Sequence, residues 1–304
     1  MNRWLPLASC LWIIGAAGCH GGGAPRPAVA ARAALAEIDT HAFLRLRCAL
    51  DGRDVVYTWT GAAYAFMPDV APRHVFDLVG MNVARCLRWG DRWFLTSREL
   101  MLYLEPGTRR VLDRWTNPWT GDEVPVVHVA NRLVQNELGG SLPALVSGSL
   151  ATISVDVPLG YPNPLAATPE LAKLDPHPVY RAGEFFTFVT PLDPLLDAER
   201  ATVSDVALAW HRIGPFLPWM AMGDRTGDLV YSAQGRKLAP GEHLAPELAQ
   251  AIDRVPVFRS APACVVEGRN ETSWTYFARH AAAYQRGARF PVDDTAADPP
   301  CRAR

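Results

Sequence analysis

The first half of the chain is dominated by short runs in which polar and apolar residues alternate, each ending at a turn signal. Val55–Trp59 alternates directly after Asp51-Gly52, and Leu100–Leu104 alternates before Pro106-Gly107. A period of two is typical of half-buried strands. A turn about every 8–12 residues favours antiparallel pairing over βαβ units. The sequence therefore predicts a mainly β fold: a single large antiparallel β-barrel or strongly curved sheet with a few short helices and a C-terminal helix.

Local patterns predict where strands give way to other structure. Ala30–Ile38 is predicted as a short helix, and the apolar alternation of Phe43–Leu50 predicts the first strand. Pro158–Pro178 is rich in proline and is predicted to be a long irregular loop. Pro246–Asp253 begins with a proline, as helices often do. Ser273–Arg286 has apolar residues at helical spacing, which predicts the C-terminal helix.

The charge balance and the motifs exclude several classes of partner. The chain has 30 Lys and Arg against 31 Asp and Glu, so its net charge is −1. No basic excess is available to bind nucleic acid or an anionic membrane surface. The sequence has no Gly-rich phosphate loop, no H-E-x-x-H and no G-x-S-x-G pattern. We therefore expect no nucleic-acid partner, no cofactor and no metal.

The N-terminus predicts export. Arg3 precedes the apolar segment Leu5–Ala17, which is too short to cross a bilayer as a helix. Ala16-Ala17-Gly18-Cys19 resembles a bacterial lipobox, in which the cysteine receives the lipid. We predict a signal peptide over residues 1–18, a lipid on Cys19, and a flexible tether over 19–32. An ordinary secretory peptide cut near the same place is the alternative.

Export places the remaining cysteines in an oxidising compartment. Cys264 and Cys301 lie in irregular segments near the C-terminus and are the candidate disulfide. The pairing of Cys48 and Cys86 stays open, and a buried free thiol is an alternative for Cys48. The spacings fit no zinc pattern. We predict one β-rich domain over residues 33–289 and a C-terminal tail over 290–304.

Four stretches together resemble a known family. They are RCALDGRDVVYTWTGAAYAF (47–66), YLEPGTRRVLDRWTNPWTGDEVPVVHVAN (103–131), WHRIGPFLPWMAMG (210–223) and NETSWTYF (270–277). Their order is similar to that in the bacterial and fungal family called domain of unknown function 1838 (DUF1838). The turn at 117–121 and the run at 214–220 are the most specific parts. The resemblance implies one structural unit from Phe43 to about Tyr284, and it implies no activity.

Strand alternation places one cation on an apolar face. Trp210 and Arg212 share a face of the predicted strand Val203–Ile213. A buried arginine must be paired or must face a polar cavity, because an unpaired buried charge is very costly. Arg212 is therefore either a ligand contact or half of an ion pair with Asp205, Asp224 or Asp228. His128 has the same two interpretations: a group facing a cavity, or a core histidine bonded to the backbone.

We therefore predict a site with aromatic walls and cations at its rim. Its candidate residues are Trp59, His128, Trp210, Arg212, Trp219, Met222, Tyr231 and Lys237. The first hypothesis is an exported lipoprotein that binds a small apolar or amphipathic ligand in a β-barrel cavity. The alternative is an enzyme using the same cavity, with His128, Arg212, Tyr231 and Lys237 in acid–base and anion-stabilising roles. A scaffold with a filled interior is a third hypothesis.

Overall fold

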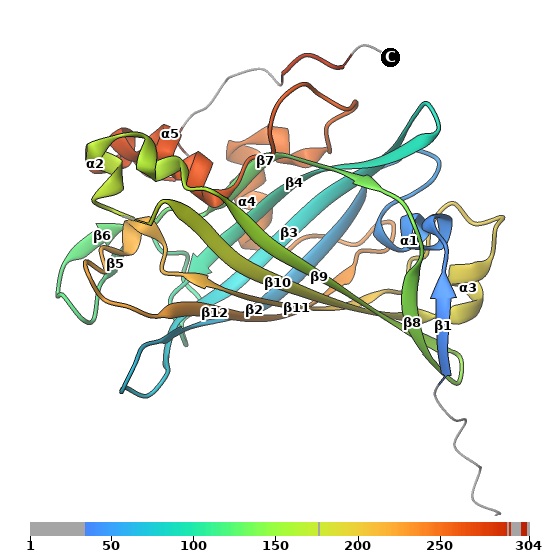
Figure 1. Cartoon of the computed structure of the whole chain (residues 1–304), viewed down its shortest axis with the longest axis horizontal. Helices are drawn as coiled ribbons and strands as arrows, with labels where there is room; N and C mark the ends of the chain where they lie inside the picture. The colour runs from blue at the N-terminus through green and yellow to red at the C-terminus, as the bar shows by residue number, and fades with distance from the viewer. Residues whose placement is uncertain (1–33, 176, 291, 293–298, 303–304) are drawn as a thin grey trace, which may run out of the picture. The chain divides into compact units, whose positions relative to one another are not determined.

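The computed structural model describes residues 34–175, 177–290, 292 and 299–302. Within these residues ten strands form one antiparallel sheet, in the order β1-β8-β9-β10-β11-β12-β2-β3-β4-β7. The sheet curls through 222° as a half-barrel (Figure 1). The prediction of a mainly β fold with a strongly curved sheet is confirmed. The predicted signal peptide, Cys19 and the tether lie outside the described residues.

The two shortest strands of the sheet, β1 and β8, lie together at one edge. The ten strands are β1 (Ala34–Ile38), β2 (Val55–Phe66), β3 (Arg73–Trp89), β4 (Arg92–Leu104), β7 (Val129–Leu138), β8 (Leu142–Ser147), β9 (Leu150–Pro162), β10 (Val179–Pro191), β11 (Ala207–Pro215) and β12 (Asp228–Lys237). A separate small hairpin consists of β5 (Arg114–Thr116) and β6 (Glu123–Pro125).

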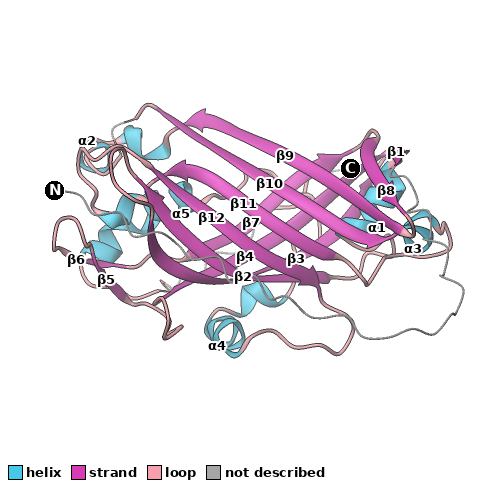
Figure 2. Cartoon of the chain, turned by 90° about the horizontal axis from the view of Figure 1, so that it is seen from below, coloured by secondary structure: helices cyan, strands magenta, loops and turns pink. Residues whose placement is uncertain are grey.

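Helices lie at both ends of the sheet and along one side. Their bounds are α1 (Thr40–Arg47), α2 (Pro169–Ala172), α3 (Leu192–Leu196), α4 (Pro246–Arg254) and α5 (Ser273–Gln285), with 3-10 turns η1 (Pro164–Ala167), η2 (Pro218–Met220) and η3 (Pro256–Arg259). Figure 2 shows α2 and α5 at one end of the sheet and α1 and α3 at the other. α4 packs on β3 and β4. α5 begins at the predicted Ser273, with Thr272 as its N-cap.

Two predictions at the start of the domain are wrong. Ala34–Ile38, predicted as helix, is strand β1, because it pairs with β8 along its whole length. Phe43–Leu50, predicted as a strand, contains most of helix α1, whose N-cap Asp39 accepts a hydrogen bond from Ala42 N at 2.7 Å. Leu44 and Leu46 alternate because α1 lies between two apolar clusters and each leucine is buried in a different one. Burial on two sides thus imitates a strand pattern.

Two disulfides link distant segments. Cys48, directly after α1, is bonded to Cys86 of β3, so Cys48 is not a free thiol. Cys264 is bonded to Cys301. The segment around Cys301 also pairs with residues 265–267 through backbone hydrogen bonds. Phe290, predicted as the first tail residue, is buried against His128.

Candidate functional site

The inner side of the curled sheet encloses a cavity of about 460 Å³. Its walls come from β2, β3, β4 and β7 on one side and from β9, β10 and β11 on the other. Residues 270–274, where α5 begins, and Phe43 and Arg47 of α1 complete the lining. A volume of this size is in the range of small-molecule sites. The cavity is therefore the candidate functional site.

Three polar side chains form one wall. Asn82, Glu99 and Asn131 are direct neighbours across β3, β4 and β7, and all three line the cavity. Asn131 Nδ2 donates to Glu99 Oε2 at 3.0 Å. This pairing depends on a β-bulge, because the register changes between Ser97, which faces Val134, and Glu99, which faces Asn131. Regular pairing would place Arg132 opposite Glu99 instead.

Trp59 belongs to the same wall. Its indole lies over Gly80, where a Cβ would come within 2.4 Å of Trp59 Nε1. Only glycine leaves this space, so Gly80 allows the ring to lie flat against β3. Gly80 precedes Asn82 by two residues, so both positions belong to the same face of β3. The indole edge therefore lies beside the Asn82–Glu99–Asn131 wall.

An arginine cluster forms the opposite wall. Arg212 on β11 is directly opposite Glu184 on β10, and its Nε lies 3.9 Å from Glu184 Oε1. Arg212 Nη2 donates to the Tyr180 hydroxyl, and its guanidinium lies 5.0 Å from the centre of the Tyr231 ring. Burial alone would lower the pKa of Arg212. Tyr180, Tyr231 and Glu184 together have the larger, opposite effect, so the pKa lies above its ordinary value and the group stays cationic. Arg212 therefore has Glu184 as its carboxylate neighbour, and the aspartates expected from the sequence are not its partners.

Four polar atoms in these walls have no hydrogen-bond partner within the described part of the chain. They are Trp59 Nε1, Asn82 Oδ1, Asn131 Oδ1 and Arg212 Nη1. All four residues line the same cavity. Leaving a buried donor or acceptor unpaired costs about 1–3 kcal/mol, and most buried polar groups are therefore satisfied. Their concentration around one cavity distinguishes this cavity from the rest of the described core.

The carboxyl of Glu99 titrates near neutrality. Burial and the neighbouring Glu184 raise the pKa of Glu99 to about 7, against the lowering effects of Asn131, Arg212 and Arg47. Burial also raises the pKa of Glu184, and Arg212 opposes that increase. The cavity thus contains two carboxyl groups that influence each other, although no paired-carboxylate motif occurs in the sequence.

The structure brings three of the eight predicted ligand contacts together. Trp59, Trp210 and Arg212 line the cavity, and the Trp59 and Trp210 ring centres are 6.0 Å apart. The remaining five are buried elsewhere: His128, Trp219, Met222, Tyr231 and Lys237. Of these five, Tyr231 contacts a lining residue directly, because its ring packs on Arg212. Its hydroxyl lies 3.2 Å from the Tyr103 hydroxyl.

His128 is a core histidine. Its Nδ1 accepts the backbone N–H of Tyr103 at 3.0 Å, and a backbone hydrogen bond links it to Leu112. Phe290 packs edge-on against its ring, with centres 4.8 Å apart. Burial lowers the pKa of His128 to about 3, so the ring is neutral at physiological pH. His128 therefore has the surroundings expected of a core histidine, and its side chain is not part of the cavity lining.

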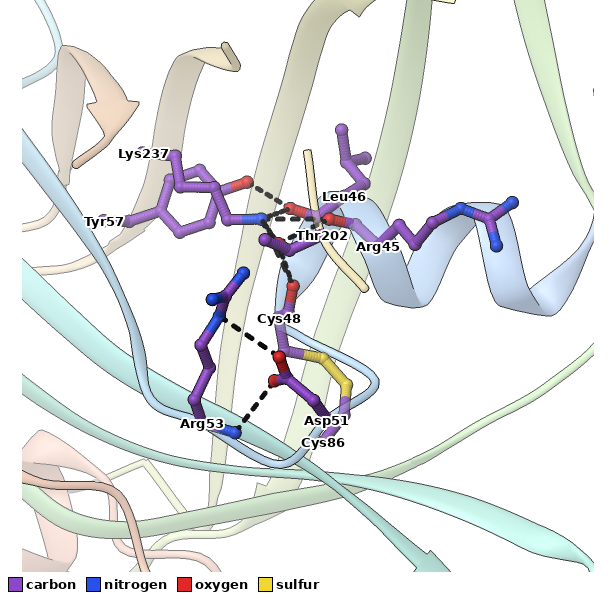
Figure 3. Close-up of a disulfide and its surroundings, with 9 residues drawn as sticks. All are labelled: Arg45, Leu46, Cys48, Asp51, Arg53, Tyr57, Cys86, Thr202 and Lys237. Atoms are coloured by element: carbon purple, nitrogen blue, oxygen red, sulfur yellow. Dashed lines mark hydrogen bonds and ion pairs between the residues drawn. A yellow bond between two sulfur atoms is a disulfide. The ribbon is translucent and has the colours of Figure 1, made fainter. Parts of the chain in front are cut away.

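Lys237 closes the end of helix α1. Its Nζ donates to the carbonyl oxygens of Leu46 at 2.8 Å and Arg45 at 2.9 Å, and to Thr202 Oγ1 at 2.8 Å (Figure 3). A cation at this position meets the carbonyls that a helix C-terminus leaves unpaired. Burial, followed by nearby Arg47, lowers the pKa of Lys237 to about 6, whereas the oxygen acceptors favour the ammonium form. Its role is structural, because it lies outside the cavity lining.

The two most specific stretches of the resemblance pack on each other. Asn117 is fully buried and its Nδ2 donates to Met220 O at 2.7 Å and lies 3.5 Å from Met222 Sδ. Trp119 meets Phe216, with ring centres 6.4 Å apart. These contacts hold the 117–121 turn against the 214–223 turn. The 214–223 turn therefore belongs to the core, and its Trp219 and Met222 are buried there.

A family model described as "Protein of unknown function (DUF1838)" matches residues 52–281. The chain belongs to the DUF1838 family. No curated protein matches the chain. The matched region of this DUF1838 protein includes both walls of the cavity and all four unpartnered polar atoms. The lining residues Phe43 and Arg47 of α1 lie before it.

Sequence reasoning missed five important lining residues. They are Tyr180, Glu184, Asn82, Glu99 and Asn131. Glu99 carried a usable signal, because it interrupts a strand whose residues 100–104 are apolar on both faces. Glu184 similarly shares its strand face with Phe186 and Phe188. A charged residue on an apolar strand face must meet a partner or a cavity. The sequence alone could not show that both glutamates face the same space.

Proposed function

We propose that this DUF1838 protein is an exported lipoprotein whose half-barrel binds a small amphipathic organic molecule in the cavity between β2–β4, β7 and β9–β11. The four unpartnered polar atoms carry the proposal. They surround a cavity that also has apolar walls, including Leu159, Phe186 and Leu208. A wholly apolar ligand would leave the four atoms unpaired, and a small inorganic ion would leave the apolar walls uncovered. An amphipathic molecule satisfies both.

The export part of the proposal rests on the N-terminal sequence. The apolar segment Leu5–Ala17 and the lipobox-like residues before Cys19 support it. Among the described residues, no helix combines the length and apolar character needed to cross a membrane. A lipid on Cys19 would provide the attachment instead.

The binding proposal is tested with a blocked cavity. Val157 lines the cavity, whereas Val179 is exposed, so Val157→Trp fills the space and Val179→Trp is the matched control. The fluorescence of N-phenyl-1-naphthylamine, a neutral apolar dye, should rise with the wild type and the control but not with Val157→Trp. Native mass spectrometry should show a co-purified molecule in the wild type and in Val179→Trp, and none in Val157→Trp. Absence of both signals in the wild type would refute the binding function.

A second candidate function is an acid–base enzyme, and Glu99 favours it. A carboxyl whose pKa is about 7 is suited to accept and return a proton near neutral pH. Glu184 and Arg212 across the cavity would stabilise charge that develops on a substrate. His128, Tyr231 and Lys237 are not part of this version, since they lie outside the lining. The enzyme function would be established if the wild type converts the co-purified molecule and the Glu99→Gln variant does not.

A further inference from the structure

We infer that the ligand class of this cavity is a hydroxylated monocarboxylic acid, with its carboxylate on Arg212 and a hydroxyl group among Trp59, Asn82 and Asn131. The inference rests on the proposed binding function and specifies its ligand. It follows from which unpartnered atoms donate, which accept, and on which wall each one lies.

The Arg212 wall requires an acceptor. Two nitrogens of Arg212 face protein groups: Nη2 donates to Tyr180, and Nε faces Glu184 at 3.9 Å. The third, Nη1, is buried without a partner. A hydrogen bond between a guanidinium and a carboxylate is about twice as strong as one between neutral groups. A ligand carboxylate is therefore the acceptor that gains most at Nη1.

The carboxyl groups of the cavity limit the ligand to one negative charge. Glu99 and Glu184 both line the space, and they face the cations Arg212 and Arg47. A dianion, such as a phosphate monoester, would be repelled by two carboxyl groups in an enclosed site. A monoanion can be received when Glu99 holds its proton. The charge pattern thus selects a single carboxylate.

The opposite wall requires a group that both donates and accepts. Asn82 Oδ1 and Asn131 Oδ1 need a donor, and Trp59 Nε1 needs an acceptor. The orientation of the Asn131 amide is set by Glu99, because Nδ2 donates to that carboxyl. A hydroxyl group has one donor hydrogen and two acceptor lone pairs, whereas an ammonium has no lone pair. A ligand hydroxyl therefore accepts from Trp59 Nε1 and donates to one of the two amide oxygens, whereas an ammonium has no lone pair for Trp59 and leaves it unpaired.

Competition with bound N-phenyl-1-naphthylamine tests the assignment. The probes are 10-hydroxydecanoate, decanoate, 1,10-decanediol and 10-aminodecanoate. The same four compounds with chains of six, eight and twelve carbons are measured as well. At the best-fitting length, the hydroxy acid should bind about tenfold more tightly than each analogue. Decanoate and 10-aminodecanoate offer Trp59 Nε1 no acceptor at that end, and the diol meets Arg212 with a neutral hydroxyl in place of a carboxylate. Equal affinity for the hydroxy acid and any analogue, or no displacement by the hydroxy acid, would overturn the assignment. Dye uptake without such selectivity leaves the binding function intact and refutes only the ligand class.

Two variants assign the ends of the ligand. Asn82→Leu should remove the preference for the hydroxy acid over the plain acid. Arg212→Met, combined with Glu184→Gln to avoid an isolated carboxyl, should remove the preference for the hydroxy acid over the diol. Circular dichroism of both variants checks that each loss of preference is measured on folded protein. Retention of either preference would place that end of the ligand elsewhere and contradict the inference.

Discussion

Asn131 donates its side-chain amide hydrogen to Glu99 across β7 and β4, and its own oxygen has no hydrogen-bond partner among the residues that the structure describes. The β-bulge at this position makes Asn131, and not Arg132, the direct neighbour of Glu99. An opposite cation would hold the glutamate ionised. A neutral amide leaves the pKa of Glu99 at about 7, so a shift of one residue in pairing determines whether this carboxyl can change its charge near neutral pH.

The first prediction concerns the pH dependence due to Glu99. Its pKa is about 7 in the folded protein and near 4.5 when unfolded, so the folded state binds more protons between these values. The free energy of unfolding should therefore decrease as pH rises through this window, on the order of 1–3 kcal/mol from this group. Chemical denaturation of Glu99→Gln should show a flatter profile, while the exposed Glu170→Gln control should follow the wild type.

The same protonation should affect ligand affinity. Glu184, Arg212, Arg47 and Asn131 all influence Glu99. Burial, with the neighbouring Glu184, raises the pKa of Glu99 to about 7. Affinity for a carboxylate probe should fall as pH rises from 6 to 8, and Glu99→Gln should abolish that fall. A wild-type affinity that is constant over this range would contradict the charge argument.

A second prediction separates structural and binding roles of Arg212. Arg212→Met leaves Glu184 without its cation, which should lower stability. The loss should be smaller than the roughly 3–5 kcal/mol of a fully buried pair, because Glu184 is 27% exposed and can take up a proton. Adding Glu184→Gln should restore the thermal midpoint without restoring carboxylate binding. A double variant as unstable as Arg212→Met alone would show that Glu184 is not the relevant partner.

The sequence revealed the curved sheet but only part of the site. Period-two runs identified strands such as β11 and β12, in which buried positions alternate with exposed or half-buried ones. Trp210 and Arg212 could be assigned to a common face for that reason. Leu44 and Leu46 have the spacing of a strand although they lie in a helix, since α1 is buried on two sides.

The other half of the site depends on long-range register. Glu99 and Glu184 are brought to one cavity by the curl of the sheet, and Asn131 by a bulge. Lys237 was assigned to the site because it shares strand parity with Tyr231. Its side chain meets α1 instead, and α1 was predicted as a strand. Strand parity alone could not show that the side chain of Lys237 meets a helix and lies outside the cavity lining.

The third prediction concerns the disulfide between Cys264 and Cys301, which are 37 residues apart. In the chain-entropy model, a loop of this length stabilises the folded protein by about 4 kcal/mol. Replacing both cysteines with alanine should lower the free energy of unfolding by up to this amount. Non-reducing peptide mapping of the wild type provides the direct check, and free thiols at both positions would contradict the pairing.

The fourth prediction tests the membrane anchor. Cys19→Ser removes the proposed lipid acceptor, so the protein should move from the membrane fraction to the soluble fraction. Mass spectrometry of the mature wild-type N-terminus should show a lipid on Cys19. Unchanged fractionation, together with an unmodified N-terminus, would exclude the lipoprotein proposal and leave the cavity argument untouched.

The last prediction concerns Lys237, whose Nζ donates to three carbonyl oxygens around the end of α1 and to Thr202. Lys237→Met keeps most of the side-chain volume but removes every one of these bonds. The loss should be about 1.5–3 kcal/mol, because the charged hydrogen bonds of Nζ are lost, although Arg45 O, Leu46 O and Cys48 O keep donors in Val203 N, Tyr57 Oη and Thr202 Oγ1. The only other lysine, Lys173, is exposed, so Lys173→Met is the matched control and should be neutral. Since Lys237 lies outside the cavity, the folded variant should bind N-phenyl-1-naphthylamine as the wild type does. Normal stability with lost dye binding would reverse the assignment and make Lys237 a ligand contact.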